Sequence, residues 1–266
     1  MSILQTGKSG PLLLVFMLAA GHANGRNVHV TNTERASRAH ELRQRVDDTY
    51  APYNAAHGSA EDPSSSGWKR ETIDTTKGAV YMTETEREVV IEINMMRRDP
   101  ARYAQKYLVP LRAYYQGRLF NYPGKTAMMT NEGVEALDEC IRELQRAKPE
   151  PGLSPRKGLS MAAREHVRDQ GPTGAIGHTG SDGSSLVTRL NRYGRWEISA
   201  GENISYGYHD ARTIVTSLLI DDGVPSRGHR KNLLNNSFSL VGVNIGPHRV
   251  YRDMCVMDFA AGYTSK

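Results

Sequence analysis

Residues 241–260, VGVNIGPHRVYRDMCVMDFA, hold the pattern that decides the fold. In the first part of this stretch, branched apolar residues alternate with small or polar ones, at Val241, Val243 and Ile245. This is the two-residue period of a strand. Turn-forming residues follow at 246–249, and a second strand-like run extends to Ala260. The stretch therefore predicts an antiparallel hairpin near the carboxyl end of the chain.

Helical patterns precede this hairpin and separate it from the amino-terminal part of the chain. The segment Thr83-Glu84-Thr85-Glu86 has the form of a capping box, and apolar residues then recur at helical spacing until Asp99-Pro100. We expect further helices after Asn131, over residues 160–170, from an Asp210 cap to Asp221-Asp222-Gly223, and from a Ser226 cap through Leu234. Helices before and between a few strands predict an α+β domain whose sheet is covered by helices, and not a doubly wound parallel sheet.

Composition excludes several classes of protein. The 266 residues carry 24% charged residues, a net charge of +5 and a mean hydropathy of −0.55, which indicate a globular chain and exclude a multipass membrane protein. The basic surplus is small and contains no long Lys/Arg run, so no nucleic-acid partner is expected.

The amino terminus has the pattern of a secretory signal. Lys8 precedes an apolar run at residues 11–20, and the small residues Gly21 and Ala23 follow in the order that a signal peptidase accepts. We expect residues 1–23 to be removed and the protein to be secreted, with no transmembrane segment after cleavage. An uncleaved membrane anchor is the alternative, but it needs a longer apolar core.

A polar segment separates this signal from the folded part. Residues 24–80 carry scattered charge and small residues, and Gly58 to Gly67 offers nothing to bury. We interpret this segment as a disordered linker or propeptide, and residues 81–266 as the folded domain.

The two cysteines, Cys140 and Cys255, exclude a disulfide scaffold as the main source of stability. In an oxidising compartment a single bridge between them is conceivable. Two buried free thiols are the alternative, because both residues lie on apolar faces of their predicted elements. The sequence leaves these interpretations open.

Three segments hold polar groups that a structural loop does not need: Gly177-His178-Thr179-Gly180, Gly201-Glu202-Asn203-Ile204-Ser205 and Ser226-Arg227-Gly228-His229-Arg230. They offer two imidazoles and a carboxylate, which suit zinc and similar divalent ions. His229 falls in the first turn of its predicted helix, where the helix dipole favours the neutral imidazole that a ligand must have. Glu202 follows a glycine in a turn-like context. The alternative is a set of hydrogen-bonded loop residues with no ligand.

The order His-Thr-Gly, Gly-Glu-Asn-Ile, Gly-His-Arg and a terminal hairpin resembles the CAP superfamily, also called SCP domains, of cysteine-rich secretory, antigen-five and pathogenesis-related proteins. The helix at residues 88–100 resembles that of the cysteine-poor branch found in bacteria and protists. The resemblance implies a three-layer α-β-α sandwich over roughly residues 83–262. It also implies a cleft in which two His and two acidic residues can hold a divalent cation.

By this resemblance, His178 and His229 match the two histidines and Glu202 the first acid, and these three are the candidate metal ligands. The second acid of the animal and plant members lies in a helix whose counterpart here, Ala211 to Ile220, contains none. Asp221 and Asp222 are the local substitutes, and we choose Asp222.

The resemblance further implies an extracellular binding module that takes Zn²⁺ or another divalent cation together with a lipid, sterol, glycan or protein. A metal-dependent hydrolase is the alternative, with His178 and His229 holding the metal and Glu202 acting as general base. A buried hydrogen-bond network with its function elsewhere is a third interpretation. The sequence does not decide whether the protein is an enzyme, and the binding module is the interpretation we favour.

Overall fold

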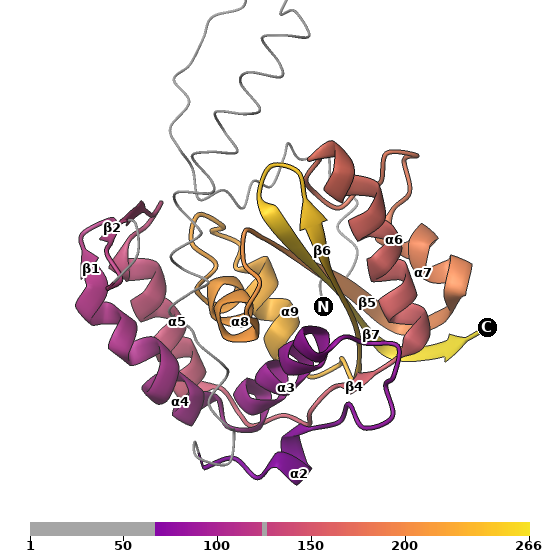
Figure 1. Ribbon diagram of the computed structural model, residues 1–266. Helices are drawn as coiled ribbons and strands as arrows, with labels where there is room; N and C mark the ends of the chain where they lie inside the picture. Colours follow the sequence, from indigo (N-terminus) through magenta and orange to yellow (C-terminus); the bar gives the residue numbers. More distant parts are fainter. Residues whose placement is uncertain (1–66, 124–126) are drawn as a thin grey trace, which may run out of the picture.

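The computed structural model describes residues 67–123 and 127–266, and a twisted four-stranded sheet runs through their centre (Figure 1). Its strands are β4 (Ser154–Pro155), β5 (Gly194–Tyr206), β6 (Leu240–His248) and β7 (Arg252–Ser265), in the order β4-β6-β7-β5. β4 pairs with β6 in parallel, and the other pairs are antiparallel. The predicted terminal hairpin is confirmed as β6 and β7.

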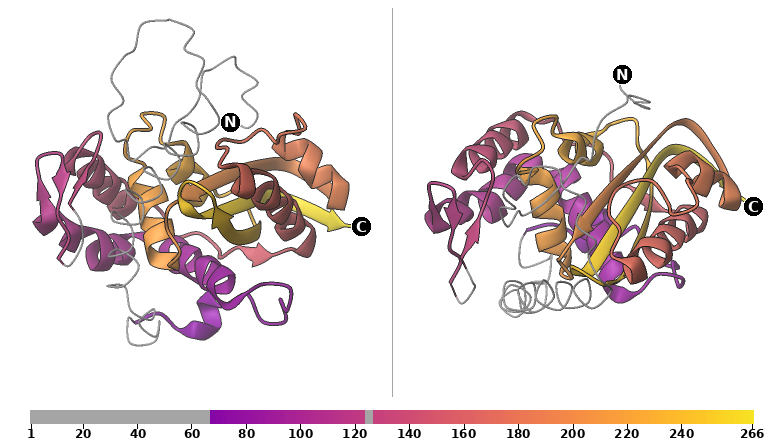
Figure 2. Two further views of the ribbon diagram at one scale, coloured as in Figure 1. Left: turned by 45° about the horizontal axis from the view of Figure 1, so that its top comes forward. Right: turned by 90° about the horizontal axis from the view of Figure 1, so that it is seen from above.

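Helices cover both faces of this sheet, as two further views show (Figure 2). One face carries α6 (Lys157–Thr173) and α7 (Leu186–Tyr193), and the other carries α3 (Glu84–Arg98), α8 (Ala211–Ile220) and α9 (Gly228–Leu234). Outside α8 lies α5 (Val134–Arg146). The predicted α+β class and its three-layer α-β-α arrangement are confirmed.

Shorter elements complete the described chain. They are α2 (Arg70–Ile73), α4 (Pro100–Tyr103), a π-helical turn η2 (Ala104–Leu108), a 3₁₀ turn η3 (Val109–Tyr114) and a small antiparallel sheet of β1 (Tyr115–Gln116), β2 (Leu119–Phe120) and β3 (Met128–Met129). No helix among the described residues is long and apolar enough to cross a membrane.

The starts of the helices show which of the predicted capping residues form caps in the structure. The capping box at α3 is present in full, since Thr83 N donates to Glu86 Oε2 at 2.8 Å and Glu86 N donates to Thr83 Oγ1 at 3.3 Å. Asp210 caps α8 by accepting from Thr213 N at 2.8 Å. The Ser226 cap is wrong: α9 follows Arg227, whose φ is +51° and whose side chain does not cap the helix. The carboxylate of Asp221, in the turn before α9, takes that role.

The core follows the alternation of β7. Cys255, Met257 and Phe259 are fully buried against the α3 and α8 layer, whereas Met254 and Val256 pack on the other side of the sheet against α6. Cys140 lies in α5 in the first of these clusters, and both cysteines are free and buried. Of the two interpretations left open, the structure therefore has the free thiols.

The folded unit begins before residue 81, so the boundary set by composition is too late. Trp68 and Ile73 are buried, and Trp68 Nε1 donates to Met95 O at 3.1 Å. Asn94 Nδ2 donates to Ile73 O at 2.9 Å. Residues 67–80 lack a periodic pattern and are held instead by contacts with α3. The predicted signal at 1–23 and the linker up to residue 66 lie outside the described residues.

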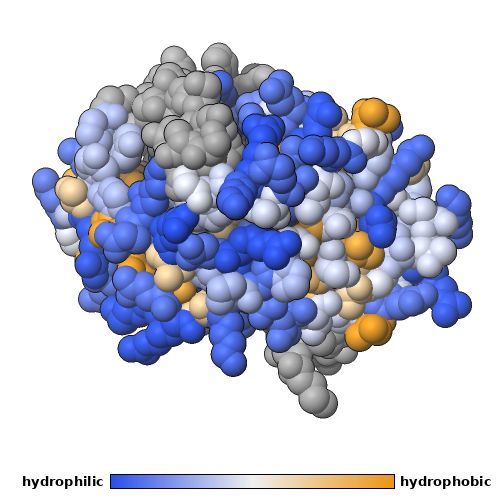
Figure 3. Space-filling view, turned by 90° about the horizontal axis from the view of Figure 1, so that it is seen from below, coloured by the Kyte–Doolittle hydropathy of each residue, from blue (hydrophilic) through white to orange (hydrophobic). Residues whose placement is uncertain are grey.

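Apolar surface is divided among small patches. On the face seen in Figure 3, hydrophobic residues stand in small groups between polar ones. The large hydrophobic side chains that are exposed in the described chain come from separate elements: Val80, Met129, Met161, Ile176 and Ile198.

Candidate functional site

His178 and Glu202 form the first pair of the site. His178 lies in the loop between α6 and α7, and Glu202 lies in β5, not in the turn that its neighbouring glycine suggested. His178 Nδ1 is 2.8 Å from Glu202 Oε1, and because an ionised carboxylate only accepts, Nδ1 donates its proton. The side chain of His178 is 45% exposed whereas that of Glu202 is 2% exposed, so a buried acid orients an accessible imidazole.

Arg189 of α7 holds the other oxygen of Glu202. Its Nη2 donates to Glu202 Oε2 at 2.6 Å, and the Arg189 side chain is 1% exposed. Burial raises the pKa of Glu202, but the hydrogen bond from His178 and the charge of Arg189 outweigh burial and lower the pKa to about 2. Both oxygens of Glu202 are therefore engaged, and the carboxylate is a weak base.

His229 and Asp221 form the second pair. His229 lies at the start of α9, and its Nδ1 donates to Asp221 Oδ1 at 2.7 Å. Asp221 Oδ2 accepts from His229 N at 3.0 Å and from Arg230 N at 3.3 Å, which supplies the helix cap that Ser226 does not. Both side chains are buried, at 7% and 0% exposure.

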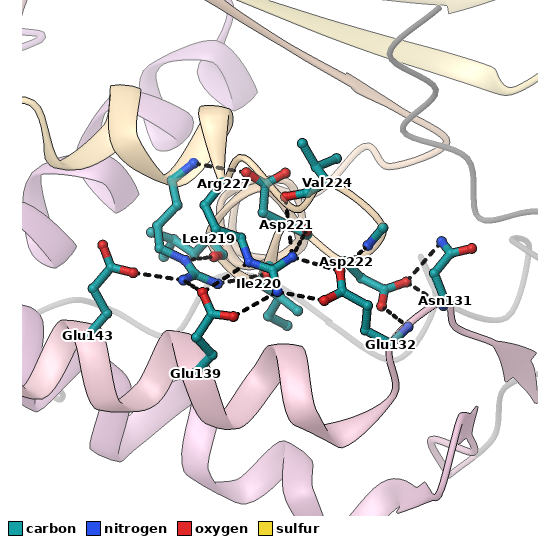
Figure 4. Close-up of polar contacts among 12 residues, drawn as sticks. Asn131, Glu132, Glu139, Glu143, Leu219, Ile220, Asp221, Asp222, Val224 and Arg227 are labelled. Carbon is teal, nitrogen blue, oxygen red and sulfur yellow. Dashed lines mark hydrogen bonds and ion pairs between the residues drawn. The ribbon is translucent and has the colours of Figure 1, made fainter. Parts of the chain in front are cut away.

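The acid that contacts His229 is therefore Asp221, whereas Asp222, the residue chosen from the sequence, binds Asn131 and Glu132 instead. The side chain of Asp222 points toward Asn131 and Glu132, in the segment that precedes α5 (Figure 4). Its Oδ2 accepts from Asn131 N and its Oδ1 from Glu132 N, each at 2.7 Å. Asp221 has a φ of +56°, so the chain reverses between the two aspartates and sends their side chains in different directions.

The two histidines line one hollow at the end of β5, beside the turn that leads into β7. It measures about 350 Å³ including its open mouth. Its wall is made by Ile176, Gly177, His178, Ile204, Tyr206, His229 and Tyr251. Tyr206 holds the loop that carries His178, because its hydroxyl accepts from Gly177 N at 2.9 Å and donates to Gln170 Oε1 at 3.1 Å.

The donor set of the hollow fits a metal held by two imidazoles. In each histidine Nδ1 donates to a buried carboxylate, which leaves Nε2 for a ligand, and metal-binding histidines usually donate their other ring N–H in this way. The described residues contain no group of three or more His, Cys, Asp or Glu side chains that could hold a metal. The two oxygens of Glu202, the predicted third ligand, are hydrogen-bonded to His178 and Arg189.

Sequence reasoning missed Arg189, Asp258 and the hollow's aromatic wall. Arg189 lies on α7, a helix that the sequence patterns did not predict. Asp258 lies opposite Glu202 across β5 and β7, is fully buried, and neither of its oxygens has a hydrogen-bond partner. Burial and the neighbouring charge of Glu202 raise the pKa of Asp258 well above its ordinary range. The two facing carboxyl groups therefore have pKa values shifted in opposite directions, with that of Glu202 lowered and that of Asp258 raised.

This pairing predicts that Asp258→Asn stabilises the protein at neutral pH. Folded Asp258 keeps a proton that the unfolded chain releases above about pH 4, so the free energy of unfolding falls as the pH rises from that point. We expect the variant to unfold at a higher urea concentration than the wild type at pH 7, because asparagine has no proton to release. The difference shrinks as the pH is lowered toward 4.

Urea unfolding at pH 4, 5 and 7 measures this difference. Asp138→Asn is the control, because it makes the same change at a carboxylate of α5 that is 27% exposed and pairs with Arg112, which is itself 49% exposed. A gain that is absent, or that does not change with pH, would contradict the raised pKa of Asp258.

The chain belongs to the CAP family of proteins. The family model, described as the cysteine-rich secretory protein family, matches residues 92–259. The chain is also similar to the uncharacterized protein YkwD of Bacillus subtilis (strain 168), with 29% identity over 122 residues that make up 44% of this chain and 46% of that protein. The chain thus spans about half the length of this curated relative.

Two solved structures are similar to parts of the chain. One is an outer surface protein from Borrelia burgdorferi, with 21% identity and a TM-score of 0.36 over 44% of this chain and 80% of that chain. The other is an extracellular protein containing an SCP domain from Bacillus anthracis str. Ames, with 26% identity and a TM-score of 0.35 over 47% of this chain and 39% of that chain.

Proposed function

We propose that this CAP protein is a secreted binding module whose hollow takes a divalent cation, with zinc as the best fit, through Nε2 of His178 and of His229. The observation that carries the proposal is that two imidazoles line one hollow while each donates Nδ1 to its own buried carboxylate. Imidazole nitrogen suits zinc, and two protein ligands leave positions for water or for an oxygen donor of a further ligand.

The carboxylates act on the imidazoles and not on the cation. Glu202 and Asp221 fix the tautomer in which Nδ1 carries the proton, so the lone pair of Nε2 is available to the ligand. When bound, the cation would supply a positive centre that attracts an oxygen-bearing group. The wall residues Ile204, Tyr206 and Tyr251 would then contact the apolar or aromatic part of that ligand.

A binding role is favoured over hydrolysis by the state of Glu202. A general base needs a free oxygen and a pKa near the working pH. Both Glu202 oxygens are hydrogen-bonded, and its pKa of about 2 makes it a weak proton acceptor. A lipid, sterol, glycan or protein remains the class of partner that the resemblance implies. Secretion rests on the signal pattern at residues 1–23.

Zinc titration calorimetry of the purified protein at neutral pH tests the proposal. We expect one site in the wild type and a loss of zinc affinity of at least about tenfold in His178→Ala/His229→Ala. Losing the carboxylate that holds a metal-binding histidine typically costs about 10- to 100-fold, and losing the histidine itself costs no less. His209→Ala is the control, since His209 pairs with Asp253 and does not line the hollow. A folded wild type that binds no zinc, or a double variant that binds equally well, would refute the cation site.

A further inference from the structure

Asp221 holds His229 from a backbone conformation that is unfavourable by itself. Its φ of +56° lies in the left-handed region, which is uncommon for residues other than glycine although aspartate enters it more readily than most. Arg227, six residues later, is also left-handed at +51°. Such conformations persist only where the surrounding structure fixes them. The turn between α8 and α9 therefore needs an external restraint, and the position of the Asp221 carboxylate depends on it.

Two arginines supply this restraint by binding the carbonyl groups of the turn. Arg227 Nη1 donates to Asp221 O at 2.9 Å and to Val224 O at 3.3 Å. Arg230 donates through Nε to Leu219 O at 2.6 Å and through Nη2 to Ile220 O at 2.9 Å. The Arg230 contacts satisfy the last two carbonyls of α8, which have no partner within the helix, and the Arg227 contacts hold the turn that follows. Both arginines place positive charge at the negative end of α8.

The arginines are in turn anchored on α5, which lines no part of the hollow. Arg227 pairs with two carboxylates along two edges of its guanidinium group: with Glu132 at 2.7 and 2.6 Å, and with Glu139 at 3.0 and 2.7 Å. Arg230 Nη1 donates to Glu139 at 2.8 Å and to Glu143 at 2.7 Å. Figure 4 shows the three glutamates extending from α5 and the segment before it toward the turn.

The chemistry of this arginine–glutamate network, Arg227 and Arg230 with Glu132, Glu139 and Glu143, requires arginine. Each arginine binds glutamate carboxylates and backbone carbonyls at the same time. This needs the planar guanidinium with its five donors, and an ammonium group cannot reproduce it. The Arg230 side chain is fully buried, whereas that of Glu139 is 42% exposed. The network therefore joins a solvent-facing helix to a buried acid beside the hollow.

We infer that Arg227 and Arg230 are positioning residues of the hollow: held by the glutamates of α5 and the segment before it, they fix the turn that aims Asp221 at Nδ1 of His229. The inference rests on the proposed function in that His229 is taken as a ligand. Its geometric content, that the network decides which ring nitrogen of His229 carries the proton, can be measured without any metal.

The test uses the whole protein with Glu139→Gln, which removes one charge that both arginines share, and with Arg230→Lys, which keeps the charge but loses the planar group. The control is Glu135→Gln, the same change on another position of the same helix. Nitrogen NMR of the metal-free protein reports the tautomer of the His229 ring, and zinc calorimetry reports the affinity of the hollow.

We expect the Nδ1-protonated population of His229 to fall in both variants and to stay unchanged in the control. We expect zinc affinity to fall about threefold to tenfold, less than the 10- to 100-fold change typical of a directly bonded partner. Variants with reduced thermal stability but an unchanged tautomer would show a merely structural network and overturn the inference. If the wild type binds no zinc, the proposed function fails, and the tautomer measurement still decides the positioning role.

Discussion

Replacing Arg189 by Met is expected to lower the free energy of unfolding by about 3–5 kcal/mol, the cost of removing one partner from a buried ion pair. The side chains of Arg189 and Glu202 are 1% and 2% exposed, so water cannot solvate the carboxylate left behind. Arg189 Nη1 also donates to the carbonyls of His178 and Ser184, each at 3.1 Å. The loop that carries His178 would lose these bonds as well.

Urea unfolding at neutral pH measures the loss. Arg192→Met is a matched control on the same helix, because Arg192 pairs with Glu165 and Asp182 but is 40% exposed. Exposed ion pairs contribute about 0–1 kcal/mol. Equal losses of unfolding free energy in the two variants would mean that the buried pair of Arg189 and Glu202 stabilises the protein no more than an exposed ion pair does.

Gly242→Ala is expected to be the most damaging small substitution in the sheet. Gly242 lies in β6 beneath α6, and a Cβ there would come within 2.2 Å of Leu159 C and of Ser160 N. These are backbone atoms of the helix, which cannot rotate away as the end of a side chain can. Overpacking of a core usually costs about 1–3 kcal/mol, and we expect at least the upper value because α6 itself must shift.

Gly228→Ala is the control for this substitution. Its Cβ would meet only Ser226 Oγ, at 3.6 Å, and Gly228 lies in α9, so alanine is expected to leave the protein equally stable or slightly more stable. Circular dichroism and urea unfolding compare the two variants. If Gly242→Ala unfolds at the same urea concentration as the control, the backbone of α6 does not lie close enough to Gly242 to exclude a methyl group.

The parts of the fold that the sequence predicted are those set by local period and local hydrogen bonds. The capping box at Thr83 and Glu86 begins α3 because both partners lie within one helical turn. The alternation of Cys255, Met257 and Phe259 places one face of β7 in the core for the same local reason. β5 was missed because Gly201 and Glu202 have the local character of a turn, and the pairing that makes them a strand comes from β7, more than fifty residues later.

The candidate site divides in the same way. The sequence by itself predicted His178, Glu202 and His229 as residues of the site, and the structure places both histidines on one hollow with Glu202 hydrogen-bonded to His178. Only the tertiary structure decided between Asp221 and Asp222, because a left-handed backbone at Asp221, held by arginines that are anchored on α5, turns one carboxylate to His229 and the other to Asn131. Two adjacent aspartates have the same local pattern, and long-range contacts alone distinguish them. Residues 67–80 joined the folded unit for the same reason, since packing on α3 and not periodicity orders them.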